Sequence, residues 1–126
     1  MASVLVIDDE ADIRDLLREL LTVLGYEVRM AENGDQGLKS YLSEPADVVL
    51  MDMFMPDKDG LETLRDLLRH DPQARVIAMS GGGTRRNYGI LKPASFMGAR
   101  RMLCKPITVE ELQTTVEETL AMPKEA

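Results

Sequence analysis

Apolar runs of strand length alternate with segments of helical periodicity five times along this chain, and this alternation constrains its fold more than any other feature. The pattern is typical of a parallel β-sheet covered on both faces, because parallel strands need crossover connections and are buried on each side. The sequence therefore predicts an α/β fold. The expected strands are residues 4–7, 27–31, 47–51, 75–79 and 102–104.

The first two helices follow from the spacing of their apolar residues. Residues 13–24 carry apolar side chains at steps of three and four, and Gly25 is a favourable residue just beyond a helix end. This stripe consists of Ile13, Leu16, Leu17, Leu20, Leu21 and Leu24. After Asn33-Gly34, a shorter helix is expected to direct Leu38, Tyr41 and Leu42 toward the core.

Two further helices are expected in the second half. One spans about residues 59–70 and ends before Asp71-Pro72, because a residue that precedes proline avoids helical geometry. The last begins after Thr108, with Glu111 completing a capping box, and ends at Met122-Pro123. Its apolar stripe is Val109, Leu112, Val116 and Leu120. Residues 81–98, rich in glycine, predict only a short helix with Pro93 in its first turn, and we expect a lid or docking surface there.

Length and composition indicate one small domain. The 126 residues are expected to form a domain over 1–122 and a short tail over 123–126. The chain shows neither an apolar run long enough to span a bilayer nor the pattern of a signal peptide, so we expect a cytoplasmic protein without membrane association. The single cysteine, Cys104, agrees with a reducing compartment.

Charge is distributed unevenly along the chain. The net charge of −7 argues against direct DNA binding. Residues 72–109 nevertheless contain no acid, and we expect their basic side chains to attract an acidic downstream protein unless acids of the last helix neutralise them. The residues proposed for this surface are Arg85, Arg86, Lys92, Arg100 and Arg101. Because like charges cluster there, we expect a monomer rather than a homodimer.

Polar side chains follow four of the expected strands where each strand ends. The carboxyl ends of parallel strands share one edge of the sheet, so these side chains should converge there. The set comprises Asp8-Asp9-Glu10, Asp52, Ser80 and Lys105. Taken singly, Asp9 or Ser80 could be a helix N-cap, but their joint placement on one edge favours a functional site.

Carboxylates crowded in one cleft require a cation, and hard oxygen ligands favour Mg²⁺ or Mn²⁺. Phosphate chemistry is then expected, with Asp52 as nucleophile accepting a phosphoryl group as an acyl phosphate. The metal, the Lys105 ammonium and the Ser80 hydroxyl would neutralise the charge on the transferred group.

Together with Met55-Pro56, Gly60, Gly98-Ala99 and Pro106, these motifs resemble the receiver domain of two-component response regulators, over the whole chain. The resemblance implies a doubly wound, flavodoxin-like sheet in the order 2-1-3-4-5 and phosphorylation of Asp52 by a histidine kinase or phosphotransfer protein. It implies Mg²⁺ bound by Asp8, Asp9, Asp52 and the Phe54 carbonyl, with Ser80 and Lys105 contacting the phosphoryl group and a cis peptide before Pro106. No output domain follows, so the chain resembles stand-alone members, which signal through proteins and are not enzymes.

Two departures from the family separate this chain from its relatives. Met102 stands where the family carries an aromatic switch residue that moves together with the Ser80 position, and the interval between Ser80 and Lys105 is longer than usual. Met102 therefore leaves open a degenerate receiver that binds partners without phosphorylation. The remaining alternative is a Mg²⁺-dependent aspartyl-phosphate phosphatase of the haloacid dehalogenase type, but that class needs an acid where Phe54 stands.

Overall fold

The computed structural model describes residues 1–55, 60–81 and 98–122. Five parallel strands form one sheet in the order β2-β1-β3-β4-β5, which confirms the predicted fold class and strand order. The strands are β1 (Ser3–Ile7), β2 (Glu27–Ala31), β3 (Val48–Asp52), β4 (Val76–Gly81) and β5 (Arg101–Lys105). The helices are α1 (Ala11–Val23), α2 (Gly34–Ser43), α3 (Gly60–His70) and α5 (Val109–Ala121).

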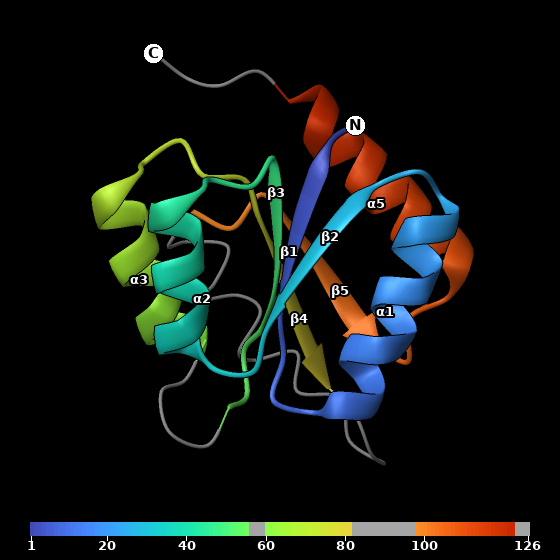
Figure 1. Cartoon of the computed structure of the whole chain (residues 1–126), viewed down its shortest axis with the longest axis horizontal. Coiled ribbons are helices and arrows are strands. Elements are labelled where there is room, and N and C mark those ends of the chain that lie inside the picture. Colours follow the sequence, from blue (N-terminus) through green and yellow to red (C-terminus); the bar gives the residue numbers. More distant parts are fainter. Residues whose placement is uncertain (56–59, 82–97, 123–126) are drawn as a thin grey trace.

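The helices form a layer on each face of the sheet, with α2 and α3 on one side and α1 and α5 on the other (Figure 1). Every residue of β3, the central strand, is buried, because helices cover both of its faces. Alternate β3 residues therefore belong to different cores: Val49 and Met51 pack under α2 and α3, whereas Val48 and Leu50 pack under α1 and α5.

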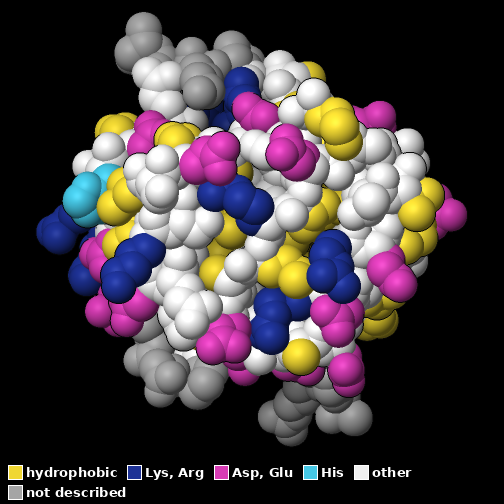
Figure 2. All heavy atoms as spheres, viewed as in Figure 1, with side chains coloured by type: hydrophobic (Ala, Val, Ile, Leu, Met, Phe, Trp, Pro, Cys, Tyr) yellow, Lys and Arg dark blue, Asp and Glu magenta, His cyan; other side chains and the backbone are white. Residues whose placement is uncertain are grey.

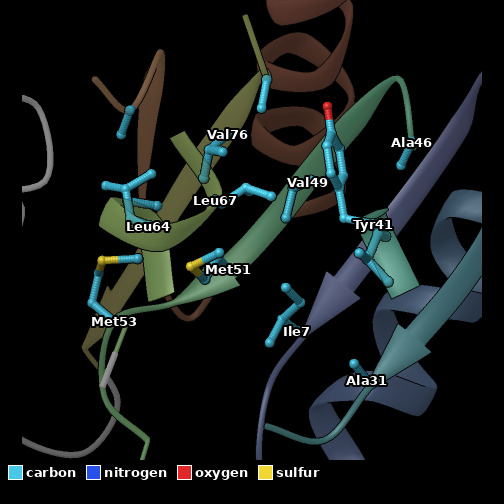
Figure 3. Packing of buried hydrophobic residues seen from close by; sticks show 14 of the residues in the cluster. Ile7, Ala31, Tyr41, Ala46, Val49, Met51, Met53, Leu64, Leu67 and Val76 are labelled. Atoms are coloured by element: carbon cyan, nitrogen blue, oxygen red, sulfur yellow. The ribbon is translucent and has the colours of Figure 1, made fainter. Parts of the chain in front are cut away.

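In the first core, Leu64 and Leu67 of α3 lie near Met51, and Tyr41 of α2 lies near Val49 (Figure 3). The methionines Met51, Met53, Met55 and Met79 are buried, which agrees with a role as core residues. In the second core, Leu17 and Leu21 of α1 belong to the same buried cluster as Leu112 and Val116 of α5. These apolar contacts hold the strand ends in fixed positions.

The helix ends agree with their sequence signals. Gly25 follows α1 with a φ of 97°, a conformation that favours glycine. Thr108 caps α5: its Oγ1 accepts from the Glu111 N–H at 3.1 Å, and Glu111 closes the capping box. Asn33 caps α2 by accepting from the Gln36 N–H at 2.9 Å.

Three apolar residues expected in helix stripes are exposed instead. Leu16, Leu42 and Val109 have exposed fractions of 48%, 46% and 43%. Leu16 and Leu42 lie on the flank of the buried stripes, which pass through Leu17 in α1 and Tyr41 in α2, and Val109 is the first residue of α5. The apolar stripes are therefore narrower than the sequence pattern indicates.

Other expectations differ in detail or lie outside the described residues. Cys104 in β5 is half-buried, and His70 is exposed at the end of α3. The short helix predicted near Pro93 and the tail 123–126 lie outside the part of the chain that the structure describes. No helix within that part is long and apolar enough to cross a membrane.

Candidate functional site

The strand register brings the predicted site residues to one edge of the sheet. Ile7 pairs with Met51, so Asp8 and Asp52 follow paired positions at the ends of β1 and β3. Gly81 pairs with Lys105 at the ends of β4 and β5, one residue after Ser80. Residues far apart in sequence therefore share this edge, as the strand pattern predicted.

Lys105 is the centre of this arrangement. Its side chain is almost fully buried, and its Nζ donates to Asp8 Oδ2 at 2.8 Å. The same Nζ lies 3.5 Å from Asp52 Oδ2 and 3.8 Å from Glu10 Oε1. One ammonium thus joins carboxylates from β3 and from the β1–α1 turn. The peptide before Pro106 is cis, as expected.

Glu10 belongs to the site, although its position in the sequence indicated no separate role for it. It lies in the acidic run after β1, and this run is the one sequence feature that indicates a role for Glu10 in the site. Its side chain is 62% exposed. Ligand oxygens of Asp8, Asp9 and Glu10 lie within 4.8 Å of one another. Oxygen-only donors of this kind suit Mg²⁺, which takes carboxylates and water.

The two aspartates of the β1–α1 turn differ in environment. Asp8 is buried, and its Oδ1 accepts from the Glu10 N–H at 3.0 Å, which shapes the turn. Asp9 is exposed, and the N-cap position of α1 belongs to Glu10, so the interpretation of Asp9 as an N-cap is wrong. The capping alternative also fails for Ser80, which is buried inside β4.

Asp52 is held at the end of β3 with an exposed fraction of 3%. Its Oδ1 accepts from the Phe54 N–H at 3.0 Å, while its Oδ2 faces Lys105. Burial raises the pKa of Asp52 to about 7 and the charges of Asp8 and Asp9 add to the increase, against the opposing effects of the Phe54 N–H and Lys105. Burial is therefore the main cause of the raised pKa, and the neighbouring carboxylates add to it.

The pKa of Lys105 is raised, so this side chain stays charged. Burial by itself lowers the pKa, but the hydrogen bond to Asp8 and the charges of Asp52, Asp8 and Glu10 outweigh that effect. The charged form of Lys105 is therefore the one that contacts the carboxylates.

Gly60 allows α3 to begin directly beneath Asp52. Its N–H donates to the Met53 carbonyl at 3.1 Å. A Cβ at this position would overlap the main-chain oxygen of Asp52 and the Cα of Met53. The glycine thus permits the close contact that fixes the backbone on both sides of the candidate nucleophile.

Two of the remaining predicted site residues are exposed. Phe54 and Met102 are 45% and 41% exposed. The roles assigned to the Phe54 carbonyl, to Ser80 and to Met102 stay predictions, because no contact of the described residues tests them.

Arg101 Nε lies 3.6 Å from Glu118 Oε1, so one residue of the expected basic surface is partly neutralised by α5. Arg85, Arg86 and Lys92 lie outside the described residues. On the face seen in Figure 2, acidic and basic side chains of the described residues are interspersed.

Comparison with known proteins agrees with this geometry. A family model described as response regulator receiver domain matches residues 4–117. The chain is 32% identical to the chemotaxis protein CheY of Bacillus subtilis over 118 residues, covering 93% of this chain and 96% of CheY. It is 33% identical to sporulation initiation phosphotransferase F of the same species over 119 residues, covering 94% of each.

A solved structure of a response regulator receiver domain protein from Clostridium thermocellum superposes with a TM-score of 0.88 at 32% identity, covering 95% of this chain and 94% of that one. Sequence and fold thus match along nearly the whole length, and the acidic edge described above lies at the ends of the matched strands. The chain belongs to the response regulator receiver domain family.

Proposed function

We propose that this chain is a single-domain response regulator that accepts a phosphoryl group on Asp52 from a histidine kinase or phosphotransfer protein, in a Mg²⁺-dependent reaction. It then signals through protein–protein contacts that depend on phosphorylation. The observation that carries the proposal is the buried Lys105 ammonium, which lies 2.8 Å from Asp8 and 3.5 Å from Asp52. Receiver domains are signalling phosphoacceptors that bind Mg²⁺ at an acidic pocket.

The chemistry follows from the positions of the side chains. A carboxylate oxygen of Asp52 attacks phosphorus, the bond from phosphorus to the donor nitrogen breaks, and the histidine leaves with that electron pair. Lys105 then pairs with the negative phosphoryl oxygens, and the Ser80 hydroxyl donates to one of them. Mg²⁺ held at this acidic edge would supply neutralisation of the charge that develops on the transferred group. Its ligands would be Asp8, Asp9, Asp52 and the Phe54 carbonyl.

The burial of Asp52 favours transfer to this residue over reaction elsewhere. Asp9 and Glu10 are exposed, whereas Asp52 lies at the bottom of the acidic edge beside Lys105. A dry position strengthens the attraction between the ammonium and the phosphoryl oxygens. The site turns over no external substrate, because the phosphoryl group stays on the protein until it is hydrolysed.

An apolar pocket adjoins the site and suits the phosphodonor protein. It has a volume of about 100 Å³ and lies between α1 and the loop after β5. The lining residues are Ile13, Leu16, Leu17, Leu20, Lys105, Pro106 and Ile107. Because Lys105 belongs to both the pocket and the site, a protein seated there could bring a phosphohistidine toward Asp52. The exposure of Leu16 is consistent with such a contact.

The signalling output is proposed to involve Ser80, Met102 and the surface near β5. A shift of Ser80 toward phosphate would change the space around Met102, whose flexible side chain can adopt more than one position. The acidic partner expected for the surface that includes Arg100 and Arg101 stays a prediction, as do a monomeric state and a cytoplasmic location. Single-domain action is supported by the match to almost the full length of the two Bacillus subtilis relatives.

Intact mass after incubation with acetyl phosphate tests the proposal. The wild type with Mg²⁺ should gain one phosphate adduct, and the adduct should be absent with chelator or in Asp52→Asn. Asp15→Asn on the exposed side of α1 is the matched control and should be phosphorylated normally. If no adduct forms with acetyl phosphate or with a panel of histidine kinases, a receiver that acts without phosphorylation replaces this proposal.

A further inference from the structure

Arg14 makes a contact with the candidate metal site that the proposed reaction does not use. Its Nη1 donates to the main-chain oxygen of Asp8 at 2.7 Å, and the side chain is half-buried. The contact runs from α1 back to the end of β1, across the turn that carries Asp9 and Glu10. Arg14 therefore closes this turn on the side of the helix.

This contact completes the main-chain hydrogen bonding of Asp8. The Asp8 N–H donates to the Ala31 carbonyl of β2 at 3.1 Å, and its carbonyl accepts from Arg14. With both groups held, the backbone of this residue is fixed where β1 ends. The Asp8 carboxylate, which contacts Lys105 and the Glu10 N–H, is positioned by that backbone.

A cation at the position of Arg14 is electrostatically unfavourable. It is the fourth residue of α1, close to the positive end of the helix dipole. It would also repel a cation held by Asp8 and Asp9, two of the proposed Mg²⁺ ligands. The hydrogen bond to a strand-end carbonyl offsets these costs, because a charged donor forms a stronger bond than a neutral one.

We propose that Arg14 is a positioning residue that orders the Asp8-Asp9-Glu10 turn for Mg²⁺ binding. The inference depends on the magnesium site of the proposed function and adds a residue outside its ligand set. It predicts a change in Mg²⁺ affinity that is opposite in sign to the change expected from charge repulsion alone. Loss of the Arg14 charge should strengthen Mg²⁺ binding if repulsion dominates, but should weaken it if ordering of the turn dominates.

Calorimetric titration of the full chain with MgCl₂ distinguishes these signs. Arg14→Gln, which is neutral and shorter, should weaken Mg²⁺ binding by about tenfold, the lower range for loss of an outer contact to a metal ligand. Arg18→Gln is the matched control: it removes the same charge one turn later, where the side chain is 53% exposed and lies 3.8 Å from Asp15. The control should bind Mg²⁺ within about twofold of the wild type, since a half-exposed surface charge is well screened.

Amide hydrogen exchange of the metal-free protein gives a readout that does not depend on Mg²⁺. The Glu10 amide, which donates to Asp8 Oδ1, should exchange faster in Arg14→Gln than in Arg18→Gln. Arg14→Lys retains the charge and a single donor group, so it should recover part of the protection and serves if Arg14→Gln does not fold. Equal or tighter Mg²⁺ binding in the Arg14 variants, or unchanged Glu10 exchange, would overturn the inference. A wild type that binds no Mg²⁺ would instead overturn the proposed function.

Discussion

Replacing the candidate nucleophile should make the metal-free protein more stable. In Asp52→Asn, the amide keeps an oxygen for the Phe54 N–H but carries no negative charge. The wild-type carboxylate is buried near the charges of Asp8 and Asp9. Because Lys105 already pairs with Asp8 at 2.8 Å, the variant leaves the ammonium with a partner. Asparagine therefore removes an unfavourable charge and leaves no new one unpaired.

The magnitude follows from the pKa of Asp52, which is raised from 3.8 to about 7. Between these values the folded protein holds a proton that the unfolded chain releases, so the contribution of Asp52 to folding stability falls as pH rises. Each pKa unit corresponds to about 1.4 kcal/mol, so Asp52→Asn should gain about 2 kcal/mol at pH 5 and about 4 kcal/mol at pH 8.

Urea denaturation with chelator at both pH values measures the free energy of unfolding. The comparison is the difference between wild type and Asp52→Asn, which cancels the effect of the other titrating groups. Asp15→Asn on the surface of α1 controls for the change in net charge and should shift stability by less than about 0.5 kcal/mol at either pH. A variant that is no more stable at pH 8 than at pH 5, relative to wild type, would refute the reasoning.

Three further variants test the core, the last helix and the buried ammonium. Leu21→Ala should lower the free energy of unfolding by about 3 kcal/mol in urea titrations, whereas Leu16→Ala, 48% exposed on the same helix, should lower it by less than about 1 kcal/mol. Thr108→Ala removes the capping box of α5 and should cost about 1 kcal/mol by the same measurement. Lys105→Met leaves buried carboxylates unpaired, so it should lower the free energy of unfolding at neutral pH by about 3 kcal/mol and lower the melting temperature with it. An unchanged melting temperature would contradict this.

Topology explains why the centre of the site could be predicted from the sequence. Asp8 and Lys105 are 97 residues apart, yet both end strands of one parallel sheet, so their contact follows from the fold. The strand pattern needs only apolar runs of the right length, and each polar residue that ends a run is then placed at the same edge. The resemblance to receiver domains supplied the strand order that the runs alone did not determine.

Contacts that depend on side-chain direction were not predictable in this way. The sequence pattern placed Leu16 and Leu42 on apolar stripes, but whether a residue at the edge of a stripe is buried depends on how its helix is rotated over the sheet. The contact of Arg14 with the Asp8 carbonyl also depends on the direction of a side chain. It could not be predicted from the sequence, because a charged residue near a helix start is usually solvated. Its one sequence signal is a basic residue just after an acidic run.

One excess of negative charge accounts for both the predicted instability and the predicted metal affinity of the site. Three carboxylates, those of Asp8, Glu10 and Asp52, lie within 4 Å of the Lys105 ammonium, and the Asp9 carboxylate lies beside those of Asp8 and Glu10. Without a further cation, the burial of Asp52 and this deficit of positive charge together raise the pKa of Asp52 and make the fold less stable. A divalent cation would correct the same deficit, and binding to the folded state alone would stabilise it. A substitution that relieves the repulsion should therefore also weaken Mg²⁺ binding, so stability and metal affinity should change in opposite directions in Asp52→Asn.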